Sequence, residues 1–470
     1  MNFYEEVVKQ KEQLLKDLTR LLKIESTKDL SSSSEGQPMG KNIAEALDLM
    51  LTLSTQHGLH TENNEGFYGY AELKNSDNDD YIAILGHLDV VPATGDWTSP
   101  PFEPTIRDGK LFARGAIDDK GPTMAAFYAL KMLKELKMPM KRNVRIIFGT
   151  DEESGMSCLK KYREIEHSPV AGFAPDATFP IIHAEKGQIN ARCNLNFDNE
   201  TESMTSNDTL ISFQAGTRPN MVPESATAVI KDHDQAIEQQ FIHFLEKHQL
   251  EGEYFHHSGN ITLNLKGLSS HSMEPHKGIN AGMYLAQFLT TLSLNKKAKA
   301  YLSFVNLFFE DHFGKNINID HEDDITGPLT INPAIFSFEE GSSCFVHLNI
   351  RYPVSANFDA IEQKLYTLLE KYHFSFGDIR NKNPHHVDKN TAMIKYLQKA
   401  YEEETSEEAT LLSSGGNTYA SLLPNCVAYG AVFPGKVMTA HQKNEYIEIE
   451  DLLKATAIYA RAISYLANIE

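Results

Sequence analysis

Cysteine is scarce in this 470-residue chain, and no two cysteines lie close together in the sequence. Cys158, Cys193, Cys344 and Cys426 form no CxxC pair, which excludes the usual thiolate zinc sites and dithiol redox motifs. The sequence also lacks an apolar run near the ~20 residues that span a bilayer. Residues 1–15, MNFYEEVVKQKEQLL, have no apolar core of the kind found in a signal peptide. These absences predict a soluble, cytoplasmic protein.

The chain has fewer positively charged than negatively charged residues. The chain has 44 Lys and Arg against 64 Asp and Glu, so its formal net charge is -20. A surface this acidic repels phosphate backbones and anionic lipid headgroups, which argues against nucleic-acid and membrane partners. The hydrophobic fraction of 41% is ample for packed cores. A chain of this length is expected to form two or more domains.

Hydrophobic spacing predicts helices over residues 2–24 and 41–57, followed by alternating strands and helices. The stretches DYIAILG, residues 80–86, and NVRIIFGT, residues 143–150, have the apolar character of buried strands. Between them a helix is predicted over residues 122–136, and its Pro122 lies in the first turn, where proline is tolerated. This alternation indicates a largely parallel sheet covered by helices.

The pattern changes near residue 186. Strands are then predicted over 188–198, 227–232, 260–267 and 344–353, and helices near 234–248, 280–294 and 358–372. The α/β pattern returns after residue 382 and ends in a helix over 451–467. The sequence therefore predicts an α/β domain with a mixed, mostly parallel sheet, formed by residues 1–185 and 382–470. An α+β domain, residues 186–381, is inserted into it.

Polar side chains stand where several predicted strands end. The candidates are His87 after YIAILG, Asp118 and Asp119 in ARGAIDDKGP, Glu152 and Glu153 after RIIFGTD, and Asp176 in VAGFAPDATFP. Each alone is more typical of a cap or a solvated surface, and Asp151 beside the glutamate pair strengthens that interpretation. In an open α/β sheet, however, strand ends converge in space. Acids crowded together repel one another unless a cation lies among them, so the series favours a metal site.

The residue types indicate which metals fit. Imidazole and carboxylate ligands without thiolate suit zinc, and also manganese or cobalt. His441, in VMTAHQKNEY, adds a second imidazole near the far end of the sequence. The candidates exceed the three protein ligands of a usual catalytic zinc site. Two ions that share a bridging carboxylate would use them all, and such sites activate a water held between the ions.

The blocks GHLDVVP, ARGAIDDKGP, GTDEESG and APDATFP occur in this order and resemble the signature of the aminoacylase/glutamate-carboxypeptidase superfamily of co-catalytic metallopeptidases. The chain is most similar to the bacterial dipeptidase V (PepV-like) branch, over essentially its whole length, including NIRYP, SSGGNTY and HQKNEY. The resemblance implies two divalent ions per chain, zinc first, with manganese or cobalt as alternatives. Their implied ligands are His87, Asp176, the bridging Asp118, and Glu153 and His441 on the second ion.

The same resemblance implies the roles of the neighbouring acids. Glu152 would be the general base that takes a proton from the bridging water and delivers it to the leaving amine. Asp89 would hydrogen-bond the far nitrogen of His87. The link between Asp118 and Asp119 is expected to be cis or strained.

The inserted domain resembles a lid that contributes substrate contacts. His271, in LKGLSSHSMEPHKG, matches the histidine that stabilises the tetrahedral oxyanion, and we prefer it to the nearby His276 because GxxSHSxxPxxGxNA fits the family block. Asn220 and Arg351 match positions that grip the substrate, and Arg351 suits a free carboxylate. The glycine-rich SSGGNTY loop would add donors from Gly415, Gly416 and Thr418. Asn417 and the SMEPHKG side chains depart from the relatives' pattern, which affects the substrate range.

The implied activity is hydrolysis of unblocked L-dipeptides, or of short peptides read from the amino end. The substrate amine would meet Asp119 or the neighbourhood of Glu152. The insertion over 186–381 is long and resembles the enlarged lid of the dipeptidase branch, which completes the site within one chain. The resemblance therefore implies a monomer. An N-acyl amino acid deacylase would use the same catalytic set and stays open as the alternative. A non-catalytic metal or peptide carrier would be expected to lack the base or a ligand.

Overall fold

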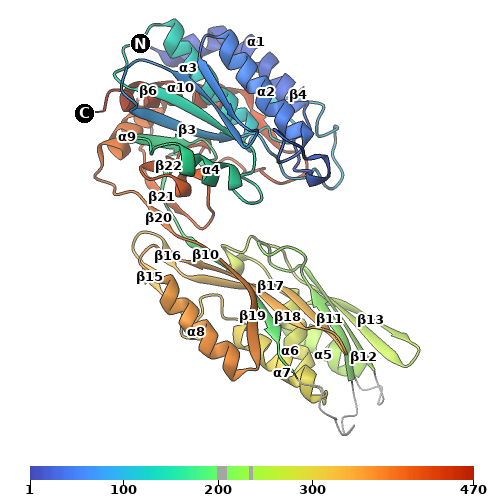
Figure 1. Ribbon diagram of the computed structural model, residues 1–470. Coiled ribbons are helices and arrows are strands. Elements are labelled where there is room, and N and C mark those ends of the chain that lie inside the picture. The colour runs from blue at the N-terminus through green and yellow to red at the C-terminus, as the bar shows by residue number, and fades with distance from the viewer. Residues whose placement is uncertain (198–208, 232–236, 470) are drawn as a thin grey trace. The chain divides into compact units, whose positions relative to one another are not determined.

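The computed structural model describes residues 1–197, 209–231 and 237–469 (Figure 1). The chain divides into two compact units. Unit 1 comprises Met1–Ala184 and His385–Glu470, and unit 2 comprises Glu185–Pro384. The sequence placed the insertion at 186–381, within a few residues of the limits of unit 2.

The main sheet of unit 1 has the strand order β1-β2-β6-β3-β7-β22-β9-β20, and β21 pairs with β9. Its centre is parallel: β6, β3, β7 and β22 run in the same direction, whereas β1, β2 and β9 are antiparallel to their neighbours. The strands are β1 (His60–Asn64), β2 (Tyr68–Leu73), β3 (Tyr81–His87), β6 (Asn143–Gly149), β7 (Ala171–Ala174), β9 (Ile181–Glu185), β20 (His385–His386), β21 (Leu411–Ser414) and β22 (Cys426–Ala428).

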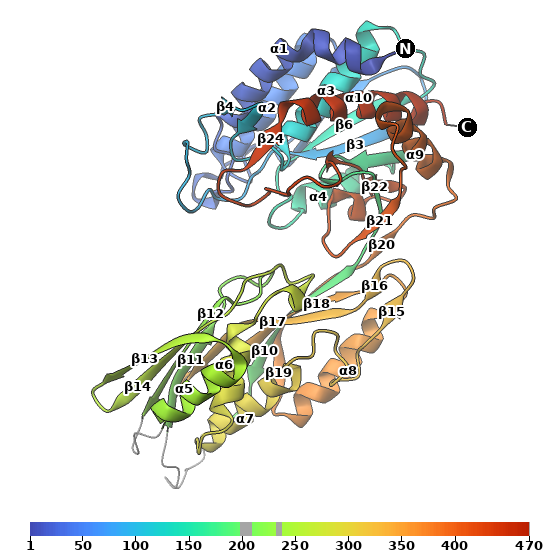
Figure 2. The same cartoon turned by 180° about the vertical axis from the view of Figure 1, so that it is seen from behind.

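Helices cover both faces of this sheet, which explains why its central strands are apolar throughout (Figures 1 and 2). Ile82 and Ile84 of β3 pack into the core cluster shared with the helices of one face. Ala83 and Leu85 point to the other face and pack into a smaller cluster. The first face holds α1 (Phe3–Leu22), α2 (Lys41–Gln56), α3 (Lys120–Glu135), α9 (Ala392–Thr405) and α10 (Ile449–Leu466); the second holds α4 (Ser157–Ile165) and η4 (Tyr419–Leu422).

Short strands join distant segments of unit 1 beside the main sheet. The strand β24 (Tyr446–Glu448) pairs with β5 (Lys110–Phe112), and β5 pairs with β4 (Thr105–Arg107). The strand β23 (Ala431–Val432) pairs with β8 (Ala177–Thr178). These pairings fasten the segment after His385 to the loops that precede α3 and follow β7. A short helix, η1 (Leu30–Ser32), lies between α1 and α2.

Unit 2 is built on an antiparallel sheet of order β13-β14-β12-β11-β17-β18-β10-β19. Along β10 the residues Ile189, Ala191 and Cys193 are buried, and the residues between them are partly exposed. The buried face packs against helices (Figure 2), as the alternation requires. The strands are β10 (Gly187–Leu195), β11 (Thr209–Ala215), β12 (Ser225–Lys231), β13 (Glu251–His257), β14 (Asn260–Lys266), β17 (Thr330–Glu339), β18 (Phe345–Tyr352) and β19 (Phe374–Lys382).

The helices of unit 2 are α5 (Ile237–His248), α6 (Ala281–Leu289), α7 (Lys296–Val305) and α8 (Phe358–Lys371), with the short helices η2 (Pro275–Lys277) and η3 (Asn306–Phe308). A small hairpin joins β15 (Glu322–Asp323) to β16 (Gly327–Pro328). In the part of the chain that the structure describes, no helix combines the length and the apolar character needed to cross a membrane.

The predicted fold class is confirmed: an α/β unit with a mixed sheet carries an inserted α+β unit. The sequence missed several elements, among them β1, β2, α4, α7 and α9. Positions 198, 232 and 234–236 of the predicted elements lie outside the described residues.

The prediction that Asp118 and Asp119 follow a strand of the main sheet is wrong. Asp119 is the N-cap residue of α3, and the preceding strand β5 belongs to the separate small sheet. The pair therefore stands at the start of a helix.

Candidate metal centre

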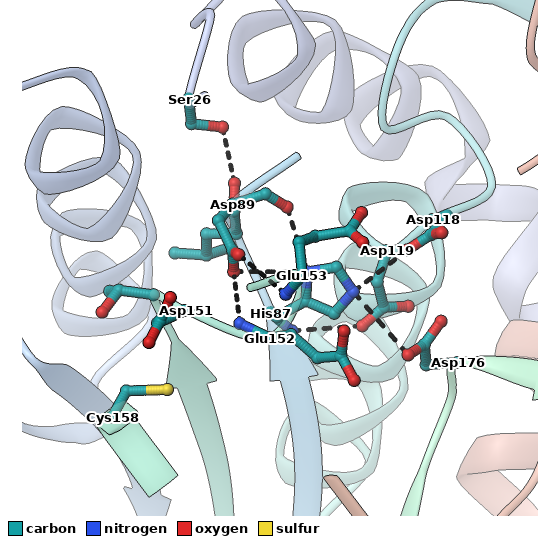
Figure 3. Close-up of polar contacts among 12 residues, drawn as sticks. Ser26, His87, Asp89, Asp118, Asp119, Asp151, Glu152, Glu153, Cys158 and Asp176 are labelled. Atoms are coloured by element: carbon teal, nitrogen blue, oxygen red, sulfur yellow. Dashed lines mark hydrogen bonds and ion pairs between the residues drawn. The ribbon is translucent and has the colours of Figure 1, made fainter. Parts of the chain in front are cut away.

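The polar residues that follow three parallel strands meet at one edge of the main sheet (Figure 3). His87 is the last residue of β3 and lies opposite Gly149, the last residue of β6. Glu152 and Glu153 follow β6 within one turn, and Asp176 follows β7 on the other side of β3. Parallel pairing thus aligns the carboxyl ends of these strands, as expected for an α/β site.

Two ligand groups form at this edge. His87, Glu152 and Asp176 each offer a ligand atom, and these atoms lie within 4.8 Å of one another. Asp118, Glu153 and His441 form a second group by the same measure. His87 is 1% exposed, whereas the side chain of His441, on the loop between β23 and β24, is 49% exposed.

Asp118 connects the two groups through its two carboxylate oxygens. Its Oδ1 lies 3.0 Å from His87 Nε2, and its Oδ2 lies 2.9 Å from His441 Nε2. His441 Nε2 also lies 3.0 Å from Glu153 Oε2, and His87 Nε2 lies 3.7 Å from Asp176 Oδ2. A carboxylate that faces one imidazole with each oxygen has the placement of a bridging ligand.

The charges of this cluster are poorly compensated by the protein alone. Burial raises the pKa of Glu152 to about 8, and burial together with Asp118 raises the pKa of Asp176 well above its usual range. Burial opposes the protonation of His441, but Asp118 and Glu153 outweigh it and raise its pKa to about 11. Burial opposes protonation of His87 too, and its hydrogen bonds to Asp118 and Asp89 raise its pKa nonetheless. Crowded acids of this kind are stabilised by a cation.

The donor atoms fit divalent metal ions. Among the described residues, Glu152 Oε1 and Glu153 Oε1 are buried and have no hydrogen-bond partner. Buried carboxylate oxygens are normally satisfied, so these two are placed to contact a metal ion or a water bound to one. The groups offer only imidazole nitrogen and carboxylate oxygen, which suits zinc, manganese or cobalt.

Asp89 supports both the histidine and the glutamate pair (Figure 3). Its carboxylate accepts hydrogen bonds from the backbone N–H groups of Glu152 and Glu153, each at 3.1 Å. His87 Nδ1 lies 3.0 Å from the backbone carbonyl of Asp89 and 3.5 Å from its Oδ1. The side chain of Asp89 thus orients the turn that carries Glu152 and Glu153. The backbone carbonyl of Asp89 lies nearer to the His87 imidazole than its carboxylate does.

The expected unusual link after Asp118 is a cis peptide bond to Asp119. Asp119 is fully buried, and its Oδ2 accepts hydrogen bonds from the backbone N–H of His87, at 3.2 Å, and from Thr123 Oγ1, at 2.8 Å. Asp119 therefore supports the backbone of His87.

Two residues of this region were not predicted from the sequence. Arg114 and Glu445 form an ion pair of 2.6 Å, with side chains 1% and 0% exposed. Glu445 Oε1 also accepts hydrogen bonds from the backbone N–H groups of Ile117, at 3.0 Å, and Asp118, at 3.2 Å. The Arg114–Glu445 pair thus joins the loop of Asp118 to the loop of His441. Both residues lie in blocks that carry the family resemblance, ARGAIDDKGP and HQKNEY, but no local pattern pairs one with the other.

Asp151 is buried, although the run of acids to which it belongs is more typical of a solvated surface. It is 1% exposed, and it accepts hydrogen bonds from Lys28 Nζ, at 2.7 Å, and from the backbone N–H of Ser157, at 3.0 Å. Burial acts to raise its pKa, but Lys28 and the neighbouring serines outweigh burial and lower it. Asp151 therefore adds contacts to the turn that carries Glu152, whose backbone Asp89 holds.

The glycine-rich loop of the sequence lies in unit 1, between β21 and η4. Gly416 donates its backbone N–H to Ser414 Oγ at 2.9 Å, and Thr418 Oγ1 accepts from Ala420 N at 3.2 Å, which caps η4. Gly415 is the residue between Ser414 and Gly416. The ring of Tyr419 meets the ring of His87 edge-on, with centroids 6.1 Å apart. The loop thus ends beside the metal centre.

The remaining predicted residues belong to unit 2. His271 and Asn220 lie on adjacent segments, because Met221 forms a β-bridge with His271 and Ser272 N donates to Asn220 O at 2.9 Å. Arg351, on β18, is 3% exposed, and its Nε donates to Asn349 Oδ1 at 3.0 Å. Burial lowers the pKa of Arg351 to about 10. His276, the alternative to His271, stacks on Phe313.

Comparison with known proteins identifies the family. The model of "Peptidase family M20/M25/M40" matches residues 83–465, which is more than half of the chain. The chain belongs to this family. The match includes all five predicted metal ligands, and it makes the M20 chain a peptide-bond hydrolase.

Full-length relatives and solved structures agree with this M20 assignment. A Bacillus subtilis (strain 168) protein named "Putative dipeptidase YtjP" is 43% identical over 470 residues, with 100% of both chains covered. A Staphylococcus haemolyticus (strain JCSC1435) protein with a name of the same form is 39% identical over 462 residues, with 98% of both covered.

Two solved structures share the fold of the M20 chain. The di-peptidase Dug1p from Saccharomyces cerevisiae has a TM-score of 0.59 at 13% identity, with 100% of this chain and 98% of that chain covered. Human carnosine dipeptidase 1 has a TM-score of 0.57 at 15% identity, with 100% and 99% covered.

Proposed function

We propose that this M20 chain is a two-metal dipeptidase that hydrolyses unblocked L-dipeptides and belongs to the PepV-like branch. The observation that carries the proposal is the placement of Asp118, which faces His87 with one oxygen and His441 with the other. The dipeptidase names of full-length relatives at 43% and 39% identity support the substrate class.

The ligand set would be shared between two ions. His87 and Asp176 would hold one ion, Glu153 and His441 the other, and Asp118 would bridge them. Zinc fits the imidazole and carboxylate donors best, with manganese and cobalt as alternatives. When bound, the ions would activate a water and polarise the peptide carbonyl.

Glu152 would move the proton of the reaction. Its carboxylate belongs to the ligand group of His87 and Asp176, its backbone is held by Asp89, and its Oε1 is buried without a hydrogen-bond partner. It would accept a proton from the attacking water and deliver that proton to the nitrogen of the leaving amine. A buried carboxylate suits both steps, because burial brings its proton affinity toward neutral pH.

Unit 2 would act as a lid that completes substrate binding. His271 and Asn220 would donate hydrogen bonds to the carbonyl oxygen as negative charge develops on it. Arg351 would pair with the free carboxylate, with help from Gly415, Gly416 and Thr418. The substrate amine would lie in the neighbourhood of Glu152. A guanidinium buried to 97% has lost most of its water, and it therefore gains more from an anionic partner than an exposed one would.

The protein would act as a cytoplasmic monomer. The long insertion supports the monomer, because one chain carries both the ligand groups and the segments of His271 and Asn220. Light scattering on the pure protein tests this state directly. A mass of a single chain of 52.8 kDa is expected.

The deciding experiment measures hydrolysis of Ala-Ala and of N-acetyl-Ala by chelated protein, with zinc, manganese and cobalt restored separately. Wild type should regain Ala-Ala hydrolysis with metal and leave the acetylated substrate nearly untouched. Glu152→Gln should bind metal normally and stay inactive. Cleavage of N-acetyl-Ala alone would turn the proposal toward a deacylase. Metal binding without hydrolysis of either substrate would contradict it outright.

A further inference from the structure

His271 and Asn220 are carried by two segments of unit 2 that are hydrogen-bonded to each other. Ser272 N donates to Asn220 O at 2.9 Å, and Val222 N donates to Ser270 O at 2.8 Å. Met221 and His271 form the β-bridge between these contacts. The two segments therefore move as one piece, and whatever fixes that piece to the sheet fixes both side chains.

One buried amide contacts both segments at once. Asn332, on the interior strand β17, is 1% exposed. Its Nδ2 donates to Met221 O at 3.0 Å, on the Asn220 segment, and to Ser272 Oγ at 2.7 Å, on the His271 segment. Its Oδ1 accepts from Asn280 Nδ2 at 3.2 Å, and Asn280 caps α6 through Met283 N. Both donors and the acceptor of the amide are satisfied.

The bonds continue past Asn332 as a directed chain. Ser272 is fully buried, and its Oγ accepts from Asn332 and donates to Pro219 O at 3.2 Å, next to Asn220. Thr330, two residues before Asn332 on β17, donates its Oγ1 to Met273 O at 3.3 Å. Residues i and i+2 of a strand share a face, so one face of β17 holds both segments.

The His271 segment also sets the tautomer of the imidazole. Met273 N lies 3.2 Å from His271 Nδ1. A backbone N–H can only donate, so Nδ1 is the acceptor and the proton of the neutral ring lies on Nε2. His271 can therefore present an N–H donor without carrying a positive charge.

We propose that Asn332 is a positioning residue for the reaction: it sets His271 and Asn220 as a preformed pair of donors. Through Ser272 it also steadies the turn in which Met273 N fixes the Nε2–H tautomer of His271. The inference rests on the proposed role of His271 and Asn220 as oxyanion donors. Asn332 touches neither substrate nor metal ligands in this scheme. It acts by removing the freedom of the donors, and preorganised donors are worth most where charge develops.

The test is Asn332→Asp in the metal-loaded protein, assayed with Ala-Ala. The change preserves size but replaces the two N–H donors with an oxygen opposite the Met221 carbonyl. We expect kcat to fall roughly tenfold to a hundredfold, less than the ~10²–10³-fold cost of deleting an oxyanion donor, with KM nearly unchanged and normal metal content. In a His271→Ala background the same change should lower kcat by a smaller factor than in the wild-type background, because only Asn220 is left to be positioned. Asn264→Asp, on the exposed face of β14, is the matched control and should keep wild-type kcat.

A second readout does not depend on catalysis. The ¹⁵N shifts of His271 in labelled protein should show the Nε2–H tautomer in wild type and a mixture of tautomers in Asn332→Asp. If Asn332→Asp does not fold, Ser272→Ala interrupts the same chain of hydrogen bonds by removing one hydroxyl. It should also lower kcat.

Equal losses of kcat in the wild-type and His271→Ala backgrounds would overturn the positioning role, as would an Nδ1–H tautomer in wild type. A wild-type protein without Ala-Ala hydrolysis would contradict the proposed function instead, and the ¹⁵N shifts would still decide the role of Asn332.

Discussion

The two ligand groups of the metal centre differ in burial and in the way the chain builds them. The group of His87, Glu152 and Asp176 follows three neighbouring parallel strands, and His87 is 1% exposed. The group of Asp118, Glu153 and His441 combines the start of α3, the turn after β6 and the loop before β24, and the His441 side chain is 49% exposed. Sheet register places the first group, whereas the second needs a separate tie.

The Arg114–Glu445 pair supplies that tie. It joins residues 331 positions apart in the sequence, and its two side chains are 1% and 0% exposed. Glu445 reaches the backbone of Asp118, which the second group shares with the first. Ligands at the ends of neighbouring strands are therefore held by the sheet itself. Ligands on loops depend on the contacts that hold those loops together.

Asp118→Asn should have the largest effect, because it removes the feature that the two groups share. An amide cannot bridge two cations as a carboxylate does, so both ions should bind weakly and Ala-Ala hydrolysis should fall by roughly a thousandfold or more. Metal analysis after dialysis, together with the rate assay, checks this. Retention of two ions per chain would show that the groups are independent.

His441→Ala should break the exposed group and spare the buried one. We expect metal content to fall to about one ion per chain and hydrolysis to drop on the order of a hundredfold. Graded chelation of wild type should release the ion of the exposed group first. His257→Ala, an exposed histidine on β13, serves as the control. Loss of both ions in His441→Ala would refute the separation of the groups.

Glu445→Gln should loosen the second group without removing a ligand. Its affinity for metal should weaken by ~10–100-fold, as for other residues that hold ligands in place. The buried Arg114 loses its partner, which costs ~3–5 kcal/mol of unfolding free energy. In Arg114→Met/Glu445→Gln the stability should largely return while the metal affinity stays low. Isothermal titration and urea unfolding measure the two effects; unchanged affinity in the single variant would contradict the tie.

Lys28→Met should have the smallest effect, because Lys28 contacts Asp151 and Ser154 on the glutamate turn but neither of the glutamates. Lys28 is 30% exposed and its partner Asp151 is 1% exposed. Loss of this pair should lower the unfolding free energy by about 1 kcal/mol and hydrolysis by less than about threefold, because Asp89 still holds the backbone of Glu152. Lys9→Met, in the more exposed Lys9–Glu6 pair, is the control. A tenfold loss of activity would mean that Asp151 governs the turn.

The sequence predicted the buried group better than the exposed one, for physical reasons. The strands β3 and β6 are buried along their whole length, so their apolar runs and the polar residues after them stand out. Asp118 was misplaced because the run before it forms only the short strand β5. His441 was a candidate only as a second imidazole, and its role as a ligand came from the family resemblance, since no spacing links it to His87. Arg114 and Glu445 pair across most of the chain, and local patterns carry no trace of such a contact.

The pairing of the strands at the two ends of unit 2 affects how the polypeptide folds during synthesis. Within unit 2, β10 and β19 pair Gln188 with Lys382, so its own folding brings its two ends together. Closing a flexible loop of about 200 residues would otherwise cost about 4–5 kcal/mol in chain entropy. Folding of the insertion offsets this entropy loss. The two segments of unit 1 can then associate almost as if they were continuous in the sequence. His441 belongs to that later segment, so the exposed ligand group can be assembled only after the insertion has been made.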